Sequence, residues 1–87
     1  MRAQDIVAHN LRKLRVKRGL SQEALAVDAE LDRTYVSRLE RQMENPTVAV
    51  LERLAKALSV KIQDFFVAPR AGAKFPAPLK GGRKPKA

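Results

Sequence analysis

The sequence contains no cysteine and only one histidine, His9. The absence of cysteine excludes a disulfide framework, a thiolate zinc site and a thiol nucleophile. His9 has no second metal ligand in view, so we expect neither a metal nor a cofactor, and we expect its side chain to be solvated.

The usual sequence patterns of enzymes and of membrane proteins are also missing. No glycine-rich loop follows a strand, and there is no histidine pair or activated nucleophile, so we predict no enzymatic activity. No run of residues approaches the about 20 apolar positions of a membrane-spanning helix. No signal peptide precedes Gln4. We therefore expect a cytoplasmic protein without membrane contact.

Acidic residues are few compared with basic ones. The chain has 9 Asp and Glu against 18 Lys and Arg, a formal net charge of +9 over 87 residues. Such an excess favours a polyanionic partner. Charge alone still leaves a nucleic-acid-binding, a ribosomal, a membrane-surface or a merely soluble basic protein as alternatives.

Composition changes at the end of the chain. Residues 67–87 contain four prolines, three glycines and six Lys or Arg, but no acidic residue. Because so few apolar groups can be buried, we predict a disordered basic tail over 67–87 and one folded domain over 1–66. The segment GGRKPK at 81–86 resembles a degenerate AT-hook. The alternative is a solubilising tail that does not contact DNA.

Apolar spacing and capping residues predict an all-α domain. Leu11 and its neighbours recur at helical intervals up to Gly19, a residue that readily ends a helix. Ser21, Asp32 and Thr47 stand where helix N-caps are expected. The predicted helical segments cover about 7–18, 22–29, 33–41, 48–58 and 62–66.

The segment 33–41 has two different faces when its residues are placed at about 100° per position. Val36, Leu39 and Tyr35 fall on one side, with Glu40 at the boundary. The opposite side carries three arginines and two small hydroxyl residues, namely Arg33, Thr34, Ser37, Arg38 and Arg41. The planar fork of arginine can bond guanine O6 and N7 together, or a phosphate. An ordinary solvated face is the alternative.

Three segments carry a resemblance to a known family: LRKLRVKRGLSQEALA, LDRTYVSRLERQMENPT and VLERLAKALSVKIQDFF. Their order and spacing resemble the Cro/phage-repressor (XRE-type) helix-turn-helix family. The tetrapeptide DRTY also resembles the controller proteins of restriction–modification systems. The resemblance implies a compact five-helix, lambda-repressor-like DNA-binding domain, with its helix-turn-helix motif at about 21–41 and 33–41 as recognition helix.

The resemblance also implies roles for individual residues. For Tyr35, half-buried packing is as good an interpretation as DNA contact. Arg15 and Glu40 match two positions that form an internal ion pair. The base-reading positions are Arg33, Thr34, Ser37 and Arg38, and the DNA-backbone positions are Ser21, Gln22, Tyr35, Arg41 and Asn45.

The sequence departs from the family pattern at four positions. Glu30 and Ser59 replace glycines, so two non-glycine residues are expected in the left-handed conformation. Ala24 replaces an acidic residue, which removes the reciprocal capping box after Ser21. Glu44 stands at a loop position that is often basic, which weakens the attraction of nearby phosphate.

The sequence thus predicts a sequence-specific transcriptional regulator, a dimeric repressor on double-stranded DNA. The last two helices carry more apolar surface than so small a core needs, and Val50, Val60 and Phe66 are the predicted dimer interface. Two alternatives stay open: an antitoxin-like protein that mainly binds a protein partner, and a restriction–modification controller.

Overall fold

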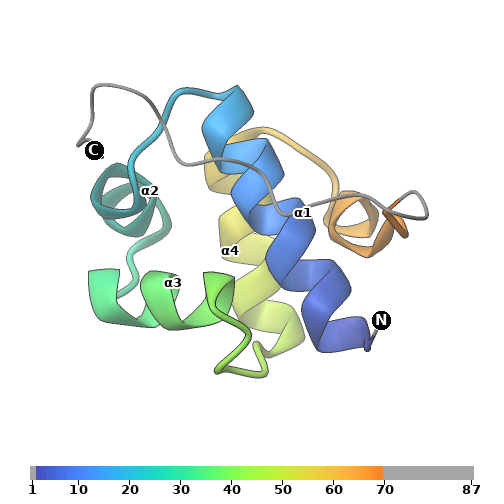
Figure 1. Ribbon diagram of the computed structural model, residues 1–87. Coiled ribbons are helices and arrows are strands. Elements are labelled where there is room, and N and C mark those ends of the chain that lie inside the picture. Colours follow the sequence, from blue (N-terminus) through green and yellow to red (C-terminus); the bar gives the residue numbers. More distant parts are fainter. Residues whose placement is uncertain (1, 70–87) are drawn as a thin grey trace, which may run out of the picture.

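The structure, a computed structural model, describes residues 2–69. Helices make up its regular structure, and no strand occurs in that range. The elements in chain order are α1 (Ala3–Lys17), α2 (Gln22–Ala29), α3 (Arg33–Glu40), α4 (Val48–Leu58) and η1 (Ile62–Phe66) (Figure 1). The predicted all-α, five-helix fold is confirmed, although η1 is a 3₁₀ helix rather than an α-helix. The basic part of the predicted tail, 70–87, lies outside the described residues.

Local sequence signals start and end most helices where we predicted, although α1 begins at Ala3 rather than near residue 7. The Ser21 hydroxyl accepts a hydrogen bond from the Ala24 N–H at 3.0 Å, and the Thr47 hydroxyl accepts one from the Val50 N–H at 3.1 Å. Gly19, after the end of α1, has a φ of +71°. These N-caps and this left-handed glycine satisfy backbone groups that a helix end would otherwise leave unpaired.

The turn between α2 and α3 uses a residue that is not glycine. Glu30 has a φ of +58°, as predicted, and so does Ser59 after α4. The left-handed conformation costs a residue with a Cβ about 1–2 kcal/mol. The turn after α2 is closed by a hydrogen bond of 2.8 Å from the Leu31 N–H to the Ala26 carbonyl.

Arg53 of α4 stabilises this turn from outside the motif. Its Nε donates to the Ala29 carbonyl at 3.0 Å, and its guanidinium also donates to the Glu30 carbonyl. A cation at the C-terminal end of α2 is favoured by the helix dipole. Arg53 therefore offsets part of the strain at Glu30, and the sequence offered no indication of this contact.

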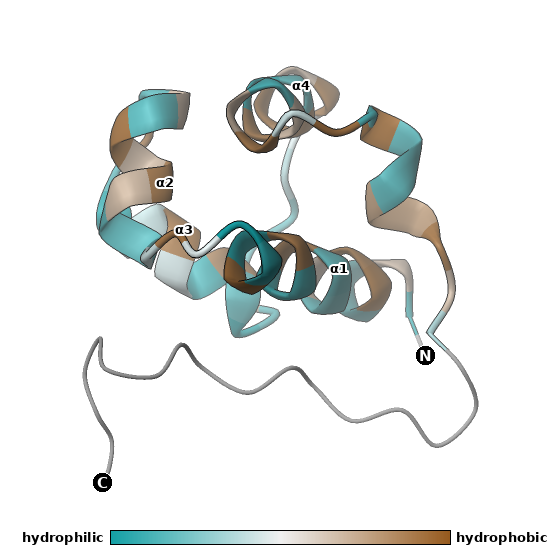
Figure 2. Cartoon of the chain, turned by 90° about the horizontal axis from the view of Figure 1, so that it is seen from above, coloured by the Kyte–Doolittle hydropathy of each residue, from teal (hydrophilic) through white to brown (hydrophobic). Residues whose placement is uncertain are grey.

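The core lies where the apolar faces of all five helices meet, as the inward-facing brown segments of Figure 2 show. Phe65 of η1 and Leu11 of α1 are completely buried in it. The buried apolar residues of the cluster are Val7, Leu11, Leu25, Ala26, Ala29, Val36, Leu39, Leu51, Leu54, Ala55, Leu58 and Phe65. Their burial is the main favourable contribution to folding.

Two expectations about polar groups were wrong. His9 is buried rather than solvated. The reason is that α1 packs against both α3 and η1, so more of its circumference is covered than one apolar stripe suggests. Asp32 occupies the N-cap position of α3, but its side chain makes no capping hydrogen bond. Because this end of α3 is exposed, water can satisfy the N–H groups.

Asn10 explains how η1 is held against α1. Its buried side-chain amide donates to the carbonyls of Phe65 and Val67, each at 2.8 Å. The hydrogen bond to the Phe65 carbonyl is buried, so water could not replace it if the Asn10 amide were lost. An unsatisfied buried carbonyl would then destabilise the fold. Asn10 therefore links the end of the described chain to the first helix.

Glu40, at the end of α3, is the most deeply buried charged residue of the described chain, at 2% exposure. Its position in the sequence predicted a place at the boundary between the apolar and the polar face of this helix. Instead, Arg15 of α1 binds both of its carboxylate oxygens, with Nε–Oε2 at 2.5 Å and Nη2–Oε1 at 2.9 Å. The ion pair predicted between these two residues is therefore present, as a bidentate contact of the strong kind.

One further hydrogen bond and one further ion pair complete the contacts of Glu40. The Gln22 amide of α2 donates to Oε1 at 3.1 Å, and the Arg12 Nε of α1 lies 3.4 Å from the same oxygen. Arg15 also donates to the Leu20 carbonyl at 2.7 Å. One buried carboxylate thus links α1, α2 and α3, and it sets the position of α3.

Replacing Glu40 should therefore destabilise the domain strongly. Glu40→Gln keeps the size of the side chain but leaves the buried Arg15 guanidinium without a countercharge, at a cost of about 3–5 kcal/mol. That is a large part of the whole free energy of unfolding of so small a domain. Urea unfolding followed by circular dichroism measures this loss.

Glu44→Gln is the matched control. Glu44 pairs with Arg38 at the surface, and such a pair is worth about 0–1 kcal/mol. The role assigned to the buried network is wrong if both variants unfold at the same urea concentration as the original chain.

Candidate nucleic-acid interface

The two faces predicted for α3 are present in the structure. Val36 and Leu39 are buried in the core, whereas Arg33 and Thr34 are exposed at the start of the helix. Arg41 is exposed directly after its end. The polar face of α3 therefore points outward, and its N-terminal turn is exposed. Figure 1 shows α3 at the edge of the domain.

Arg38 is less free than the other predicted base-reading residues. Its Nε donates to a carboxylate oxygen of Glu44 at 2.7 Å. Both side chains are partly exposed, Arg38 at 41% and Glu44 at 29%. Ser37, one position before Arg38, is partly buried. Glu44, one of the residues that depart from the family pattern, thus directly contacts a predicted base-reading residue.

The start of α2 lies close to this surface through the Glu40 network. Ser21 is exposed and caps α2. Gln22 is partly buried and uses its amide N–H on Glu40. The structure therefore brings Gln22 and the end of α3 together, and the phosphate contact of Gln22 stays a prediction.

The loop after α3 is anchored at both sides. The Met43 N–H donates to the Arg38 carbonyl at 2.9 Å, and the Gln4 side chain of α1 donates to the Glu44 carbonyl, also at 2.9 Å. Gln42 has a φ of +63°. Asn45, a predicted backbone contact, is exposed at the end of this loop.

Tyr35 is partly buried on α3 and packs against the core. Burial raises the pKa of its phenol above the ordinary value of 10.0, and the negative charge of Glu44 raises it further. Tyr35 is thus an uncharged phenol at neutral pH, able to donate a hydrogen bond. Packing and DNA contact are both compatible with this position.

The predicted dimer residues are unequally accessible. Val50 and Val60 are partly buried and pack against the core. Phe66 is 50% exposed, and the neighbouring Val67 is also exposed. Apolar surface therefore remains at the η1 end of the molecule, mostly on Phe66 and Val67.

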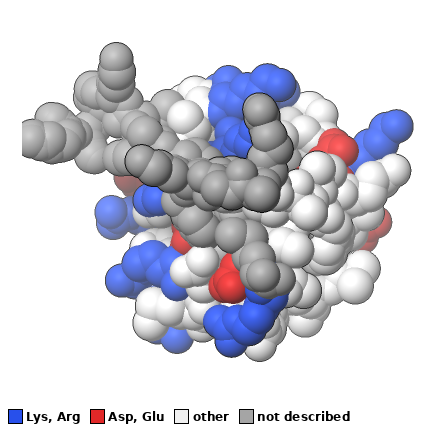
Figure 3. Space-filling model, turned by 45° about the vertical axis from the view of Figure 1, so that its right-hand side comes forward, with Lys and Arg blue, Asp and Glu red and all other residues white. Residues whose placement is uncertain are grey.

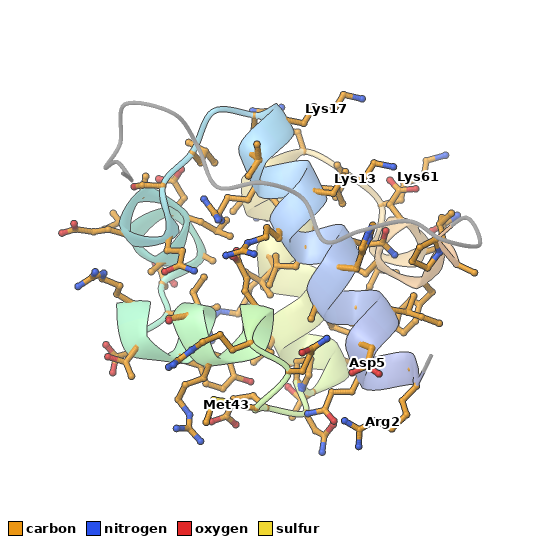
Figure 4. The ribbon with its side chains drawn as sticks, viewed as in Figure 1. Arg2, Asp5, Lys13, Lys17, Met43 and Lys61 are labelled. Atoms are coloured by element: carbon orange, nitrogen blue, oxygen red, sulfur yellow. The ribbon has the colours of Figure 1, made fainter. Side chains whose placement is uncertain are left out.

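Cations are spread over more than the α3 surface. Figure 3 shows Lys and Arg gathered at several places on one face, with isolated Asp and Glu between them. Figure 4 shows Lys13, Lys17 and Lys61 extending from the α1 and η1 side of the molecule, away from α3, while Met43, in the loop after α3, lies beneath that helix. The basic charge is a general feature, and α3 is distinguished by its arrangement of arginines and hydroxyls.

The described residues include neither a metal site nor a membrane span. No group of three or more His, Asp or Glu within 2–69 could hold a metal ion. No helix in the same range has both the length and the apolar character needed to cross a bilayer.

Comparison with known proteins now identifies the fold. Residues 11–65 match the helix-turn-helix family HTH_3. The chain belongs to this helix-turn-helix family. It is a DNA-binding transcriptional regulator.

Individual relatives of the regulator support this assignment. A hypothetical transcription factor of Neisseria meningitidis is 41% identical over 70 residues, which cover 80% of this chain and 66% of that protein. Control protein C.SmaI of Serratia marcescens is 42% identical over 62 residues, which cover 71% of this chain and 74% of that protein.

Solved structures show the same fold. The structure of the Neisseria factor has a TM-score of 0.76 and 38% identity, with 82% of each chain covered. The restriction–modification controller C.AhdI of Aeromonas hydrophila has a TM-score of 0.71 and 38% identity, over 72% of this chain and 96% of that one. The predicted resemblance to controller proteins is therefore confirmed.

Sequence reasoning missed several residues that hold α3 and the segments on either side of it. Gln4 and Arg53 bind backbone carbonyls of other elements, and Arg12 adds a second cation near Glu40. Arg12 lies three positions before Arg15, so the two arginines share one face of α1, and this spacing was a signal that could have found it. Gln4 and Arg53 belong to no apolar pattern or short motif, so only the fold could reveal their contacts.

The titration of Tyr35 is directly measurable because the regulator has one tyrosine and no tryptophan. Tyrosinate absorbance should show a pKa above 10.0, and Glu44→Gln should lower it part of the way back. As pH rises, the unfolded chain loses its phenol proton first. The stability contribution is therefore complete below 10.0 and declines as pH rises through the folded pKa. A pKa at or below 10.0 would contradict the assigned burial.

Proposed function

We propose that the regulator places α3 in the major groove of its operator, with the N-terminal turn of the helix toward the bases. The supporting observation is that Arg33 and Thr34 are exposed at this end while Glu40 anchors the other end in the core. Helix-turn-helix proteins read bases with the N-terminal residues of the second helix. Arg33, Thr34, Ser37 and Arg38 are the proposed base-reading residues.

Contacts to the DNA backbone would fix the position of α3 without reading sequence. Ser21 and Gln22 stand at the N-terminus of α2, where N–H groups and the helix dipole attract a phosphate. Arg41 and Asn45 are exposed after α3. Tyr35 is proposed as a further phosphate or base-edge contact through its phenol.

A two-fold dimer through the α4 and η1 end would place two recognition helices one DNA turn, about 34 Å, apart. The exposed Phe66 at that end supports this arrangement, and the partly buried Val50 and Val60 are proposed to complete the interface. A related controller protein, with a TM-score of 0.70 and 38% identity, crystallised as a tetramer on its natural operator. That protein therefore acts on DNA as an assembly of several chains.

A controller of restriction–modification genes is the favoured variant of this function. The relatives include the control proteins C.SmaI, C.BamHI and C.MunI, at 37–42% identity. The motif Asp32–Tyr35, DRTY, is the sequence feature that first indicated this resemblance.

Base reading is tested at Arg33. Arg33→Ala should lose about 1–3 kcal/mol of binding free energy on the preferred site, because a bidentate base contact disappears. Binding to random DNA should change much less. The preferred site is obtained by selection from a random duplex pool, and affinities for both duplexes are then measured at one salt concentration.

Lys56→Ala removes a cation exposed on α4 and serves as control. It should leave the ratio of specific to random affinity unchanged. If Arg33→Ala also leaves that ratio unchanged, α3 is not the recognition helix.

Dimerisation is tested by sedimentation at tens of micromolar protein. We expect a dimer, and Phe66→Ser should shift it toward monomer because the substitution removes exposed apolar surface from the proposed interface. Val27→Ser, which removes a valine that is 70% exposed on α2, is the control. A monomer that binds one half-site as tightly as the full palindrome would exclude the proposed dimer.

A further inference from the structure

Among the side chains proposed to read bases, Arg38 is held by a carboxylate of its own chain. The 2.7 Å hydrogen bond joins its Nε to Oε2 of Glu44. Glu44 comes from the loop after α3, six residues further along the chain. The pair is therefore a contact between the recognition helix and the segment that follows it.

Glu44 is itself fixed by the fold. Its carbonyl accepts the hydrogen bond from the Gln4 side chain of α1, and the preceding Met43 N–H binds the Arg38 carbonyl. The loop is thus tied both to α1 and to the recognition helix. A carboxylate on an anchored backbone can orient an arginine more precisely than one on an unanchored loop.

The atom that Glu44 binds determines what Arg38 can do. A guanidinium has five N–H donors in a fixed plane, and the bond at Nε uses one of them. The two terminal nitrogens carry the other four, and together they form a fork suited to guanine O6 and N7. Binding at Nε therefore orients Arg38 while leaving this fork for a base edge.

The charge of Glu44 has a second consequence. A carboxylate beside the guanidinium repels a full phosphate charge more strongly than the partial charges of a base edge. The same charge reaches Tyr35, whose pKa is raised by burial and then by Glu44. Glu44 therefore acts on two side chains of α3, Arg38 and Tyr35, and not on a remote surface.

We propose that Glu44 is a positioning residue for sequence specificity, which orients Arg38 toward a base edge and weakens its binding to phosphate. This role rests on the proposed function of α3. Structural support alone is a poor explanation for the pair, because partly exposed ion pairs add little stability. We expect Glu44 to lower the affinity for DNA of any sequence and to raise the ratio of specific to random affinity.

Two variants separate orientation from charge. Glu44→Gln keeps an oxygen that can accept the Arg38 hydrogen bond but removes the charge. Glu44→Ala removes both. Each variant of the full chain is put through the same selection from random duplexes, and its affinities for the preferred site and for random DNA are measured at several salt concentrations.

Both variants should bind random DNA several-fold more tightly than the original chain, because one repulsive charge is gone. Glu44→Ala should in addition lose about tenfold of the preference at the base pair that Arg38 reads. Glu44→Gln should keep most of that preference. Glu52→Gln, which removes an exposed carboxylate on α4, should change neither quantity beyond a small uniform gain.

Arg38→Ala identifies the base pair that Arg38 reads. It also separates the proposed role of Glu44 from the proposed function of α3. If Arg38→Ala changes a base preference but Glu44→Ala leaves it intact, the role of Glu44 is wrong and the recognition helix stands. If neither Arg38→Ala nor Arg33→Ala changes any preference, the proposed function fails as well. Matching thermal unfolding curves for all variants show that folding is not the cause.

Discussion

The buried carboxylate of Glu40 is the constraint on which the recognition surface depends. It is bound by Arg15 on two oxygens and by Gln22 on one, so three helices meet at a single charged group. A buried charge that loses its partner is costly, whereas the intact pair adds little net stability. Its effect is therefore geometric, because it permits one arrangement of α3 against α1 and α2.

The neighbouring contacts extend this constraint to both ends of the motif. Arg53 binds the carbonyls at the end of α2, where Glu30 takes the left-handed conformation. Gln4 holds the loop after α3 through the Glu44 carbonyl. The turn before the recognition helix and the loop behind it are both tied to helices outside the motif. Such support keeps side chains in one geometry, which base reading requires.

Charge and specificity are balanced on the outward face of α3. A net charge of +9 favours binding to any DNA, since phosphate attraction does not depend on sequence. Selectivity then needs groups that favour base edges over phosphate. In the proposed function the exposed Arg33 and Thr34 provide such groups, while Glu44 adds a negative charge beside Arg38. A very basic protein can in this way remain selective.

The sequence by itself determined the features that depend on neighbouring residues. Caps at Ser21 and Thr47 and the left-handed Gly19 follow from local backbone chemistry, and the family resemblance indicated the Arg15–Glu40 pair. Only the tertiary structure decided which polar groups are buried, as at His9 and Asn10, and which carbonyls Arg53 and Gln4 bind. These contacts join residues 23 to 57 positions apart, except for His9, whose burial depends on how α1 packs. Spacing along a chain carries no information about such distant partners, because packing alone brings them together.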